Sequence, residues 1–333
     1  MKILLVTDAW APQTNGVVTT YTHVIESLTA GGHDVVTIEP RQFPTAPLPG
    51  YAEIRIAATP WRVGAMIDET RADAIHIATE GPLGLAARRH LVRRGIAFTT
   101  ALHTKFPEYV NVRLGLPLAV GYRFMGWFHD AAARTLVTTP SHKEELEAWG
   151  LENLRVWGRG VDTRRFRPGG RPRHRGHRLL YVGRVAVEKN IEDFLELAVD
   201  AHKVIVGDGP HRDAYQRRYP EVEWAGYRFG EQLVSSYADA DVFVFPSRTD
   251  TFGLVMLEAM ACGTPVAAFP VTGPRDVVIE GVNGALDEDL GQAVHRALQV
   301  PRESCRAFAL ANDWEVVAQR FVSGLARISP PWP

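Results

Sequence analysis

Cysteine is scarce in this chain, and long apolar runs are missing. The two cysteines, Cys262 and Cys305, fit neither a metal-site spacing nor a disulfide framework, so we expect both to be structural. No apolar stretch approaches the ~18 residues of a membrane-spanning helix. The first residues, 1–7, turn polar too soon for a signal peptide. These absences predict a globular protein that remains in the cytoplasm.

Three other patterns are missing, and each excludes a class of protein. The loop after the first predicted strand lacks the G-x-G-x-x-G fingerprint, which argues against a nicotinamide dinucleotide. The basic segment 167–176 has no interleaved aromatic residues and no nucleic-acid-binding module around it, so no nucleic-acid partner is expected. No internal repeat recurs at the period of a solenoid.

The charges are unevenly distributed, although the net charge is only −1. Lysine and arginine outnumber aspartate and glutamate over residues 1–178, and the acidic residues prevail over 179–333. A basic first half is suited to an anionic partner, such as a membrane surface or a phosphorylated acceptor. Alternatively, the opposite charges attract the two halves of the chain to each other.

The order of short apolar runs and amphipathic stretches predicts an α/β fold with two doubly wound parallel sheets. A length of 333 residues with 46% apolar content is enough for two domains of ~150 residues. We expect a first domain over 1–165, a linker over 166–177 and a second domain over 178–310. A last helix within 311–333 could cross back to the first domain.

One stretch, 242–268, carries the strongest local prediction. Residues 242–245 are typical of a buried strand, 252–261 of a helix and 265–268 of the next strand. The backbone N–H groups of Phe252, Gly253 and Leu254 then face the carboxyl ends of the strands, where a phosphate is favoured. Asp250 and Glu258 could accept hydrogen bonds from ligand hydroxyls. The alternative is a capped junction with ordinary surface carboxylates.

Four other residues follow predicted strands, either directly or within the long loop that precedes the first predicted helix. Arg184 and Lys189 flank a strand-end loop, from which they could reach the two phosphates of a nucleotide. His103 directly follows the strand 98–101 and can donate, accept or titrate near neutral pH, although a single histidine is usually structural. Gly16, after Asn15, lets the backbone turn tightly near a ligand.

Together these segments resemble the retaining GT-B glycosyltransferases of family four, over nearly the whole chain. The resemblance is carried by residues 8–18, by His103-Thr104 with Phe106-Pro107, by 183–190, by 207–210 and by 239–263. Residues 76–84 and 270–278 are similar to one branch, which contains diacylglycerol glycosyltransferases of sulfoquinovosyl, glucosyl or glucuronosyl type and GDP-mannose-dependent α-mannosyltransferases. The implied fold is two Rossmann-like domains facing across a cleft.

The resemblance also implies roles for single residues. The family has a Glu-x7-Glu pair in which the second member, here Glu258, binds the nucleotide ribose. The first member is Asp250 in this chain, one methylene shorter, and its contact is with the donor sugar. Phe252, Gly253 and Leu254 match the segment that holds the distal phosphate and the sugar.

The remaining site residues divide between the two implied domains. His103 would contact the sugar, and Gly16 the diphosphate or the acceptor. Arg184 and Lys189 would stabilise the leaving diphosphate in place of a metal ion, so no metal and no other cofactor is expected. No Asp-x-Asp stands at a suitable strand end, because Asp239-Ala240-Asp241 precedes a strand.

The function predicted in this way is retaining transfer of a hexose from UDP-glucose or UDP-glucuronate to a lipid hydroxyl, such as that of diacylglycerol. The alternative is a GDP-mannose-dependent α-mannosyltransferase acting on a lipid or saccharide. A nucleotide-sugar 2-epimerase and a non-catalytic sugar-nucleotide-binding protein are less favoured. The first domain could touch an anionic membrane peripherally through residues 114–128 or through the helix that contains Arg88 and Arg94. The alternatives are a core helix for 114–128, which is favoured, and a solvated face for the arginine-containing helix.

Overall fold

The computed structural model describes residues 1–11, 13, 16–48, 51–103, 105–170, 176–250, 252–329 and 332. The chain forms two compact units: unit 1 is Met1–Gly158 with Trp314–Pro333, and unit 2 is Arg159–Asp313. Unit 2 therefore begins before the expected linker, 166–177. Phe166 is only 5% exposed and belongs to the core of unit 2. Residues 171–175 of that expected linker lie outside the described residues.

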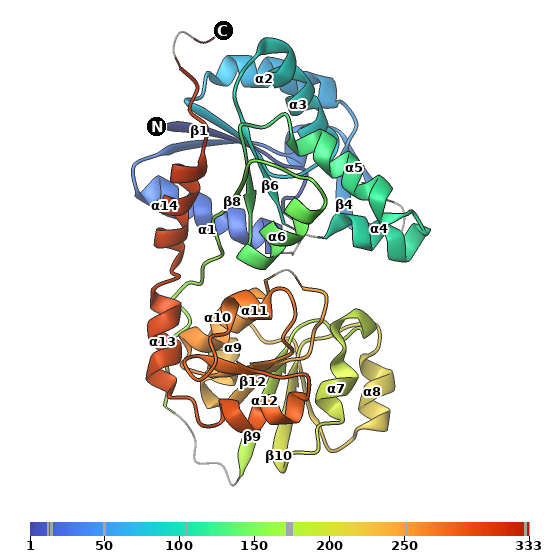
Figure 1. Ribbon diagram of the computed structural model, residues 1–333, viewed down its shortest axis with the longest axis vertical. Coiled ribbons are helices and arrows are strands. Elements are labelled where there is room, and N and C mark those ends of the chain that lie inside the picture. The colour runs from blue at the N-terminus through green and yellow to red at the C-terminus, as the bar shows by residue number, and fades with distance from the viewer. Residues whose placement is uncertain are drawn as a thin grey trace. The chain divides into compact units, whose positions relative to one another are not determined.

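Unit 1 is built on a parallel six-stranded sheet with the order β2-β1-β5-β6-β7-β8 (Figure 1). Its strands are β1 (Lys2–Val6), β2 (Asp34–Ile38), β5 (Ala74–Ile77), β6 (Thr99–Leu102), β7 (Arg134–Val137) and β8 (Leu154–Val156). Strands β3 (Thr45–Leu48) and β4 (Tyr51–Ala57) form a separate antiparallel pair. Residues 54–56, which are typical of a strand, therefore belong to this pair and not to the main sheet.

Helices cover both faces of this sheet. On one face α1 (Gly16–Ala30) packs against α14 (Trp314–Gly324), so the end of the chain completes unit 1. On the other face α2 (Val63–Thr70) and α3 (Pro82–Arg94) pack on Leu4 and Val6. The other helices of this unit are α4 (Phe106–Leu114), α5 (Leu118–His129) and α6 (Pro140–Ala148).

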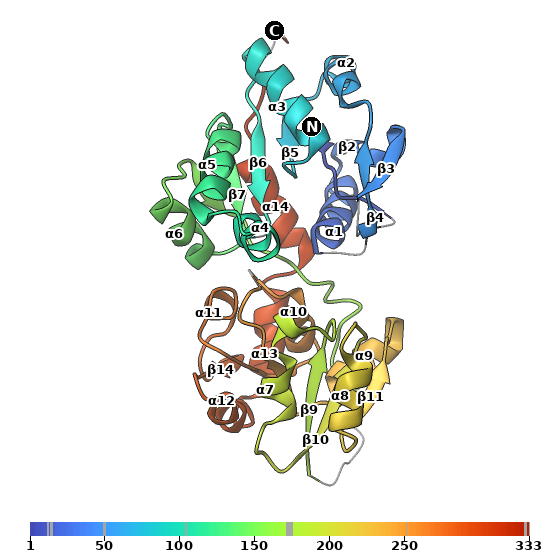
Figure 2. The ribbon, with the colours of Figure 1, turned by 90° about the vertical axis from the view of Figure 1, so that its right-hand side faces the viewer.

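Unit 2 repeats the architecture with the strand order β11-β10-β9-β12-β13-β14, again parallel (Figure 2). Its strands are β9 (His177–Val182), β10 (Ala201–Val206), β11 (Glu223–Gly226), β12 (Val242–Phe245), β13 (Val266–Ala268) and β14 (Gly284–Leu286). Its helices are α7 (Ile191–Leu195), α8 (Arg212–Arg218), α9 (Gly230–Asp239), α10 (Leu254–Ala261), α11 (Pro274–Val277), α12 (Leu290–Ala297) and α13 (Arg302–Leu310).

The apolar runs of unit 2 are explained by burial on both faces of the sheet. Successive side chains of a strand point to opposite faces, so Phe243 and Phe245 join the core beneath α9, α10 and α13. Val244, between them, joins the core beneath α7, α8 and α12. A continuous apolar strand such as 242–245 is therefore required at the centre of a doubly covered parallel sheet. Cys262 and Cys305 are buried free thiols in the first of these cores.

Each sheet has a point at which the strand order reverses. In unit 2 the chain runs from β9 outward to β11 and then returns to β12 on the other side of β9. In unit 1 it runs from β1 to β2 and then crosses to β5. Open α/β sheets bind ligands outside the carboxyl ends of the strands at such a point. A ligand is therefore expected at the loops that follow β9 and β12, or at those that follow β1 and β5.

Candidate functional site

The two loops at the reversal point of unit 2 are bonded to each other. The hydroxyl of Thr249, after β12, donates to the carbonyl of Glu188, after β9, at 3.2 Å. The side-chain amide of Asn190 donates to the carbonyl of Pro246 at 3.3 Å. The Lys189 ammonium donates to both carboxylate oxygens of Asp250, at 2.7 and 2.8 Å. Residues that are far apart in sequence thus form one polar edge.

Arg184 lies on this edge with its guanidinium in solvent. Its side chain is 59% exposed, and the nearest carboxylate oxygen, that of Glu188, lies 4.0 Å away. The backbone is better held, because the Tyr181 hydroxyl donates to the Arg184 carbonyl at 2.9 Å. An exposed ion pair at this distance contributes little, so the guanidinium can turn toward an anionic ligand.

Helix α10 begins at Leu254, two residues later than the sequence pattern indicates, and Thr251 lies outside the described residues. Gly253 precedes it with φ of 78°, a left-handed conformation that suits glycine. A Cβ atom at Gly253 would lie 2.8 Å from the Phe245 ring. The first N–H groups of a helix have no acceptor within it, so this junction can bind an anion.

Glu258, in the second turn of α10, is held by a partner that the sequence analysis missed. The Tyr237 hydroxyl, on α9, donates to Oε2 of Glu258 at 2.7 Å. The backbone carbonyl of Tyr237 in turn accepts from the Thr264 hydroxyl at 2.6 Å. Burial raises the pKa of Glu258, and the hydrogen bond from Tyr237 opposes that rise. One carboxylate oxygen is therefore fixed, which orients the other.

His103 and Gly16 are the predicted residues of unit 1. His103 follows β6, is 9% exposed and has its Nε2 atom 2.9 Å from the Tyr21 hydroxyl oxygen. Gly16 is the first residue of α1, and its carbonyl accepts from the Thr20 hydroxyl at 2.6 Å. Gly16 thus opens a helix and does not form the tight turn expected from its sequence. Asn15, which precedes Gly16, and Thr104, which follows His103, lie outside the described residues.

Comparison with known proteins identifies the chain. The family described as "Glycosyltransferase Family 4" matches residues 14–165, and "Glycosyl transferases group 1" matches 176–300. A GDP-mannose-dependent alpha-mannosyltransferase of Corynebacterium glutamicum is 32% identical over 318 residues, which cover 86% of this chain and 76% of that protein. The chain belongs to glycosyltransferase family 4.

Two further comparisons bear on the fold and on the relatives of this glycosyltransferase. An alpha-monoglucosyldiacylglycerol synthase of Streptococcus pneumoniae is 26% identical over 374 residues, covering 96% of this chain and 83% of that one. A sucrose-phosphate synthase from Thermosynechococcus elongatus has a TM-score of 0.78 at 21% identity, covering 97% of both chains. The predicted GT-B fold, with two Rossmann-like domains, is confirmed.

The glycosyltransferase has a second conspicuous loop contact, which the sequence analysis also missed. Asp8, after β1, accepts from the backbone N–H groups of Leu83 and Gly84 at 2.8 and 3.2 Å. Its carboxylate therefore occupies the amino end of α3, next to the reversal point of unit 1. Burial raises its pKa, and the N–H donors oppose this rise. This helix end is capped by the protein's own anion and is not a phosphate site.

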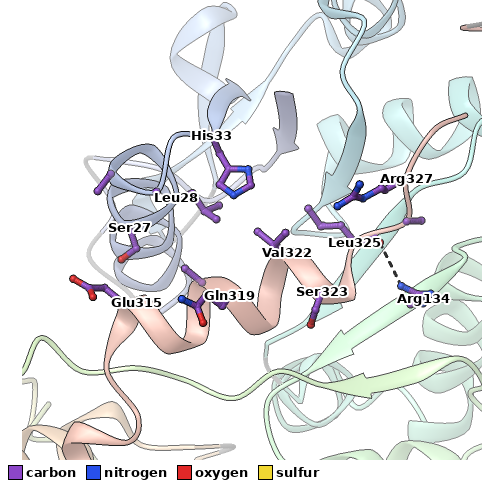
Figure 3. Close-up of a pocket in the computed structure, with 14 residues that line it drawn as sticks. Ser27, Leu28, His33, Arg134, Glu315, Gln319, Val322, Ser323, Leu325 and Arg327 are labelled. Atoms are coloured by element: carbon purple, nitrogen blue, oxygen red, sulfur yellow. Dashed lines mark hydrogen bonds between the residues drawn. The ribbon is translucent and has the colours of Figure 1, made fainter. Parts of the chain in front are cut away.

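Unit 1 also contains a pocket of about 990 Å³ between α1 and α14 (Figure 3). It lies at the amino ends of strands: His33 precedes β2, Arg134 opens β7 and Arg327 bridges to Ala74, the first residue of β5. Arg134 donates to the carbonyl of Leu325 at 3.3 Å, across the wall of the pocket. The pocket is thus at the end of the sheet opposite to His103, and no predicted site residue lines it.

The described part of the chain offers neither a cluster of metal ligands nor a helix that could span a membrane. There, no three residues among His, Cys, Asp and Glu are grouped to hold a metal ion. The helices found in the same ranges are too short or too polar to cross a membrane. Metal-independent transfer remains a prediction that rests on Arg184 and Lys189.

Proposed function

We propose that this glycosyltransferase is a GDP-mannose-dependent α-mannosyltransferase that acts on a hydroxyl of a lipid or saccharide acceptor. The observation that carries this proposal is the 32% identity to an enzyme of that name over most of both chains. Transfer from UDP-glucose or UDP-glucuronate to diacylglycerol, the main expectation from sequence, is supported more weakly, by a 26% identical glucosyldiacylglycerol synthase.

The donor is proposed to bind at the polar edge of unit 2. The ribose hydroxyls would donate to the Glu258 carboxylate, whose second oxygen is oriented by the bond from Tyr237. The diphosphate would lie at the start of α10 and accept from Arg184 and Lys189. Lys189 then exchanges part of its contact with Asp250 for a phosphate oxygen, which is a charge-assisted acceptor like the carboxylate oxygen that it replaces.

The proposed chemistry follows from where charge develops. As the bond from the anomeric carbon to the phosphate breaks, the sugar becomes oxocarbenium-like and the diphosphate gains negative charge. Two cations and a helix start at the same edge of the sheet stabilise that charge once Arg184 has turned toward the diphosphate and Lys189 has exchanged part of its contact with Asp250. We propose retention, with a leaving phosphate oxygen taking the acceptor proton, so that no protein base is assigned. His103 is proposed to contact the mannose near the reacting carbon.

A donor panel tests this proposal. Purified protein is incubated with GDP-mannose, UDP-glucose or UDP-glucuronate, each with diacylglycerol and with a mannoside, in the presence and absence of EDTA. We expect glycoside only with GDP-mannose, at a rate that EDTA leaves unchanged, and with the α-configuration retained by NMR. Turnover with a UDP-sugar alone would instead support the first expectation, and a free epimerised sugar would indicate an epimerase.

The acceptor is proposed to be presented at an anionic lipid surface, bound by the helices of unit 1 that carry exposed apolar residues and cations. Val120 and Trp127 of α5 are 44% and 53% exposed, although Tyr122, Met125 and Phe128 of the same helix are buried. The Arg88 guanidinium of α3 lies 4.0 Å from the Trp127 ring centroid. An aromatic ring beside cations suits the headgroup region of a membrane.

Vesicle sedimentation tests the lipid surface separately from catalysis. Binding to vesicles that contain phosphatidylglycerol, and weaker binding to pure phosphatidylcholine, is expected. Trp127→Ala should reduce binding, whereas Phe229→Ala should not, because this ring is 72% exposed but belongs to unit 2. Equal losses in both variants, or no binding to either vesicle, would remove the membrane from the proposal and leave a saccharide acceptor.

A further inference from the structure

A chain of hydrogen bonds leads from His103 into the core of unit 1. The Tyr21 hydroxyl oxygen lies 2.9 Å from Nε2 of His103 and 2.8 Å from Nε2 of His76. Nδ1 of His76 lies 2.9 Å from the Thr99 hydroxyl, and this hydroxyl donates to the Ile75 carbonyl at 3.3 Å. Tyr21, His76 and Thr99 are at most 1% exposed.

The donor and the acceptor of each of these four hydrogen bonds are fixed by the last acceptor in the chain, the Ile75 carbonyl. A carbonyl can only accept, so the single proton of the Thr99 hydroxyl points to Ile75. Thr99 must then accept from Nδ1–H of His76, and the neutral His76 ring has its lone pair on Nε2. That lone pair accepts from the Tyr21 hydroxyl, whose oxygen accepts from Nε2–H of His103.

The neutral form of His76, which this direction requires, is also favoured by its surroundings. Burial is the larger cause that lowers the pKa of His76 to about 3, and the nearby His129 ring adds to it. Aromatic rings enclose the chain of hydrogen bonds: the Phe321 ring centroid lies 4.9 Å from that of His76, and the Trp157 centroid lies 6.1 Å from that of Tyr21. Packed rings keep competing water away.

We propose that Tyr21 and His76 are positioning residues that hold the His103 ring in its Nε2–H tautomer through this directional chain. In this tautomer the neutral His103 ring has its lone pair on Nδ1. A sugar hydroxyl that contacts Nδ1 would therefore donate a hydrogen bond to it. This proposal rests on the proposed role of His103 at the donor sugar. The two can fail separately, because the tautomer exists whether or not transfer occurs.

Nitrogen NMR measures the tautomers directly. The protein is labelled with ¹⁵N-histidine, and the signals are assigned with His76→Gln and His103→Gln variants. Long-range nitrogen–proton spectra are expected to show protonated Nε2 in His103 and protonated Nδ1 in His76. The opposite tautomer at either residue in the unmodified protein would overturn the proposal, whatever the activity assay gives.

Removal of one hydroxyl tests the consequence for turnover. Tyr21→Phe keeps the packed ring and breaks the chain between the two histidines. The control is Tyr122→Phe, which also removes a largely buried hydroxyl of unit 1, one that donates to Glu108 at 2.6 Å. Tyr21→Phe should give mixed His103 tautomers and at least a tenfold lower kcat with little change in KM for the donor.

The control separates positioning from general loss of stability. Tyr122→Phe should lower the thermal midpoint as much as Tyr21→Phe does, with a kcat close to that of the unmodified enzyme. Unchanged His103 tautomers in Tyr21→Phe, or equal losses of kcat in the two variants, would overturn the positioning role. If the unmodified protein transfers no sugar with any donor, the proposed function fails and the tautomer measurement still decides the chain of hydrogen bonds.

Discussion

The Lys189 ammonium lies between the two carboxylate oxygens of Asp250, at 2.7 and 2.8 Å. Both side chains are about three-quarters buried, with 26% and 27% of their surface exposed. The pair joins the loop after β9 to the loop after β12, the two loops at the reversal point of the sheet. The short carboxylate in the first position of the acidic pair therefore has a structural role as well as the proposed contact to the sugar.

Asp250→Glu is expected to change donor sugar preference more than nucleotide affinity. The extra methylene moves the carboxylate toward the sugar and shifts the point at which it meets Lys189, while Glu258 and Tyr237 remain in place. The measurements are kcat/KM for GDP-mannose against GDP-glucose, and the Kd of GDP by calorimetry. Effects of equal size on both quantities would contradict the assignment of Asp250 to the sugar.

Lys189→Ala and Arg184→Ala should each lower kcat/KM by about thirtyfold, which corresponds to ~2 kcal/mol of transition-state stabilisation. The reason is that each removes a cation from the developing charge of the diphosphate. Arg217→Ala is the matched control, because Arg217 is an exposed arginine of unit 2 on α8, a helix that follows β10 and not the site strands β9 and β12. Turnover that is unchanged in both site variants would exclude this role.

Much of this edge could be predicted from the sequence, because the carboxyl ends of parallel strands meet at one edge. Arg184, Lys189, Asp250 and Glu258 each follow such a strand at a short distance, so their proximity follows from topology alone. The partners could not be predicted in the same way. Tyr237 contacts Glu258 only because α9 and α10 pack on the same face of the sheet. The spacing of residues along the sequence does not predict which side chains of two packed helices meet.

The structure also differs from the sequence-based prediction where the hydrophobic periodicity does not predict a local conformation or a contact between helices. The apolar run from Phe252 indicates a helix start, but Gly253 adopts a left-handed φ and delays the start to Leu254. The cations of α3 are a candidate for membrane contact on their sequence pattern. In the structure two of them also have protein partners that depend on neighbouring helices: Arg94 pairs with Asp68 at 3.2 Å, and Arg88 donates to the carbonyl of Phe128 at 2.9 Å.

Gly253→Ala is expected to destabilise the protein by ~1–2 kcal/mol more than Gly230→Ala. Both glycines precede or open a helix of unit 2 with positive φ, 78° and 56°. They differ in space: a Cβ at Gly253 meets the Phe245 ring at 2.8 Å, whereas nothing lies within 4 Å of one at Gly230. Thermal and urea unfolding compare the two variants.

The Gly253 variant should also bind GDP more weakly, because the crowded Cβ displaces the first turn of α10, where the diphosphate is proposed to lie. Gly230→Ala should leave the Kd unchanged. If the two substitutions cost the same stability, the crowding at Gly253 is relieved by a small shift of Phe245. If in addition GDP affinity is the same in both, the start of α10 does not bind the diphosphate.

The pH dependence of nucleotide binding should report on Glu258. Burial raises the pKa of this carboxyl, so folding favours its protonated form. Its contribution to stability is therefore present below the pKa of the unfolded chain and is lost as pH rises through the raised pKa of the folded protein. Glu258→Gln, which is never ionised, should gain stability relative to the unmodified protein as pH rises through that interval.

Binding should show the opposite trend, because the ionised carboxylate is the better acceptor for ribose hydroxyls. GDP affinity should fall as pH falls through the raised pKa, and Glu258→Gln should bind weakly at every pH.

Tyr237→Phe removes the hydroxyl that stabilises the ionised form of Glu258, so the midpoint of the pH dependence of GDP binding should move to higher pH. Calorimetry over a pH range that starts at the ordinary glutamate pKa of 4.5 and extends upward measures these curves. A midpoint that is identical in Tyr237→Phe and the unmodified enzyme would mean that Tyr237 does not tune the carboxylate that holds the ribose.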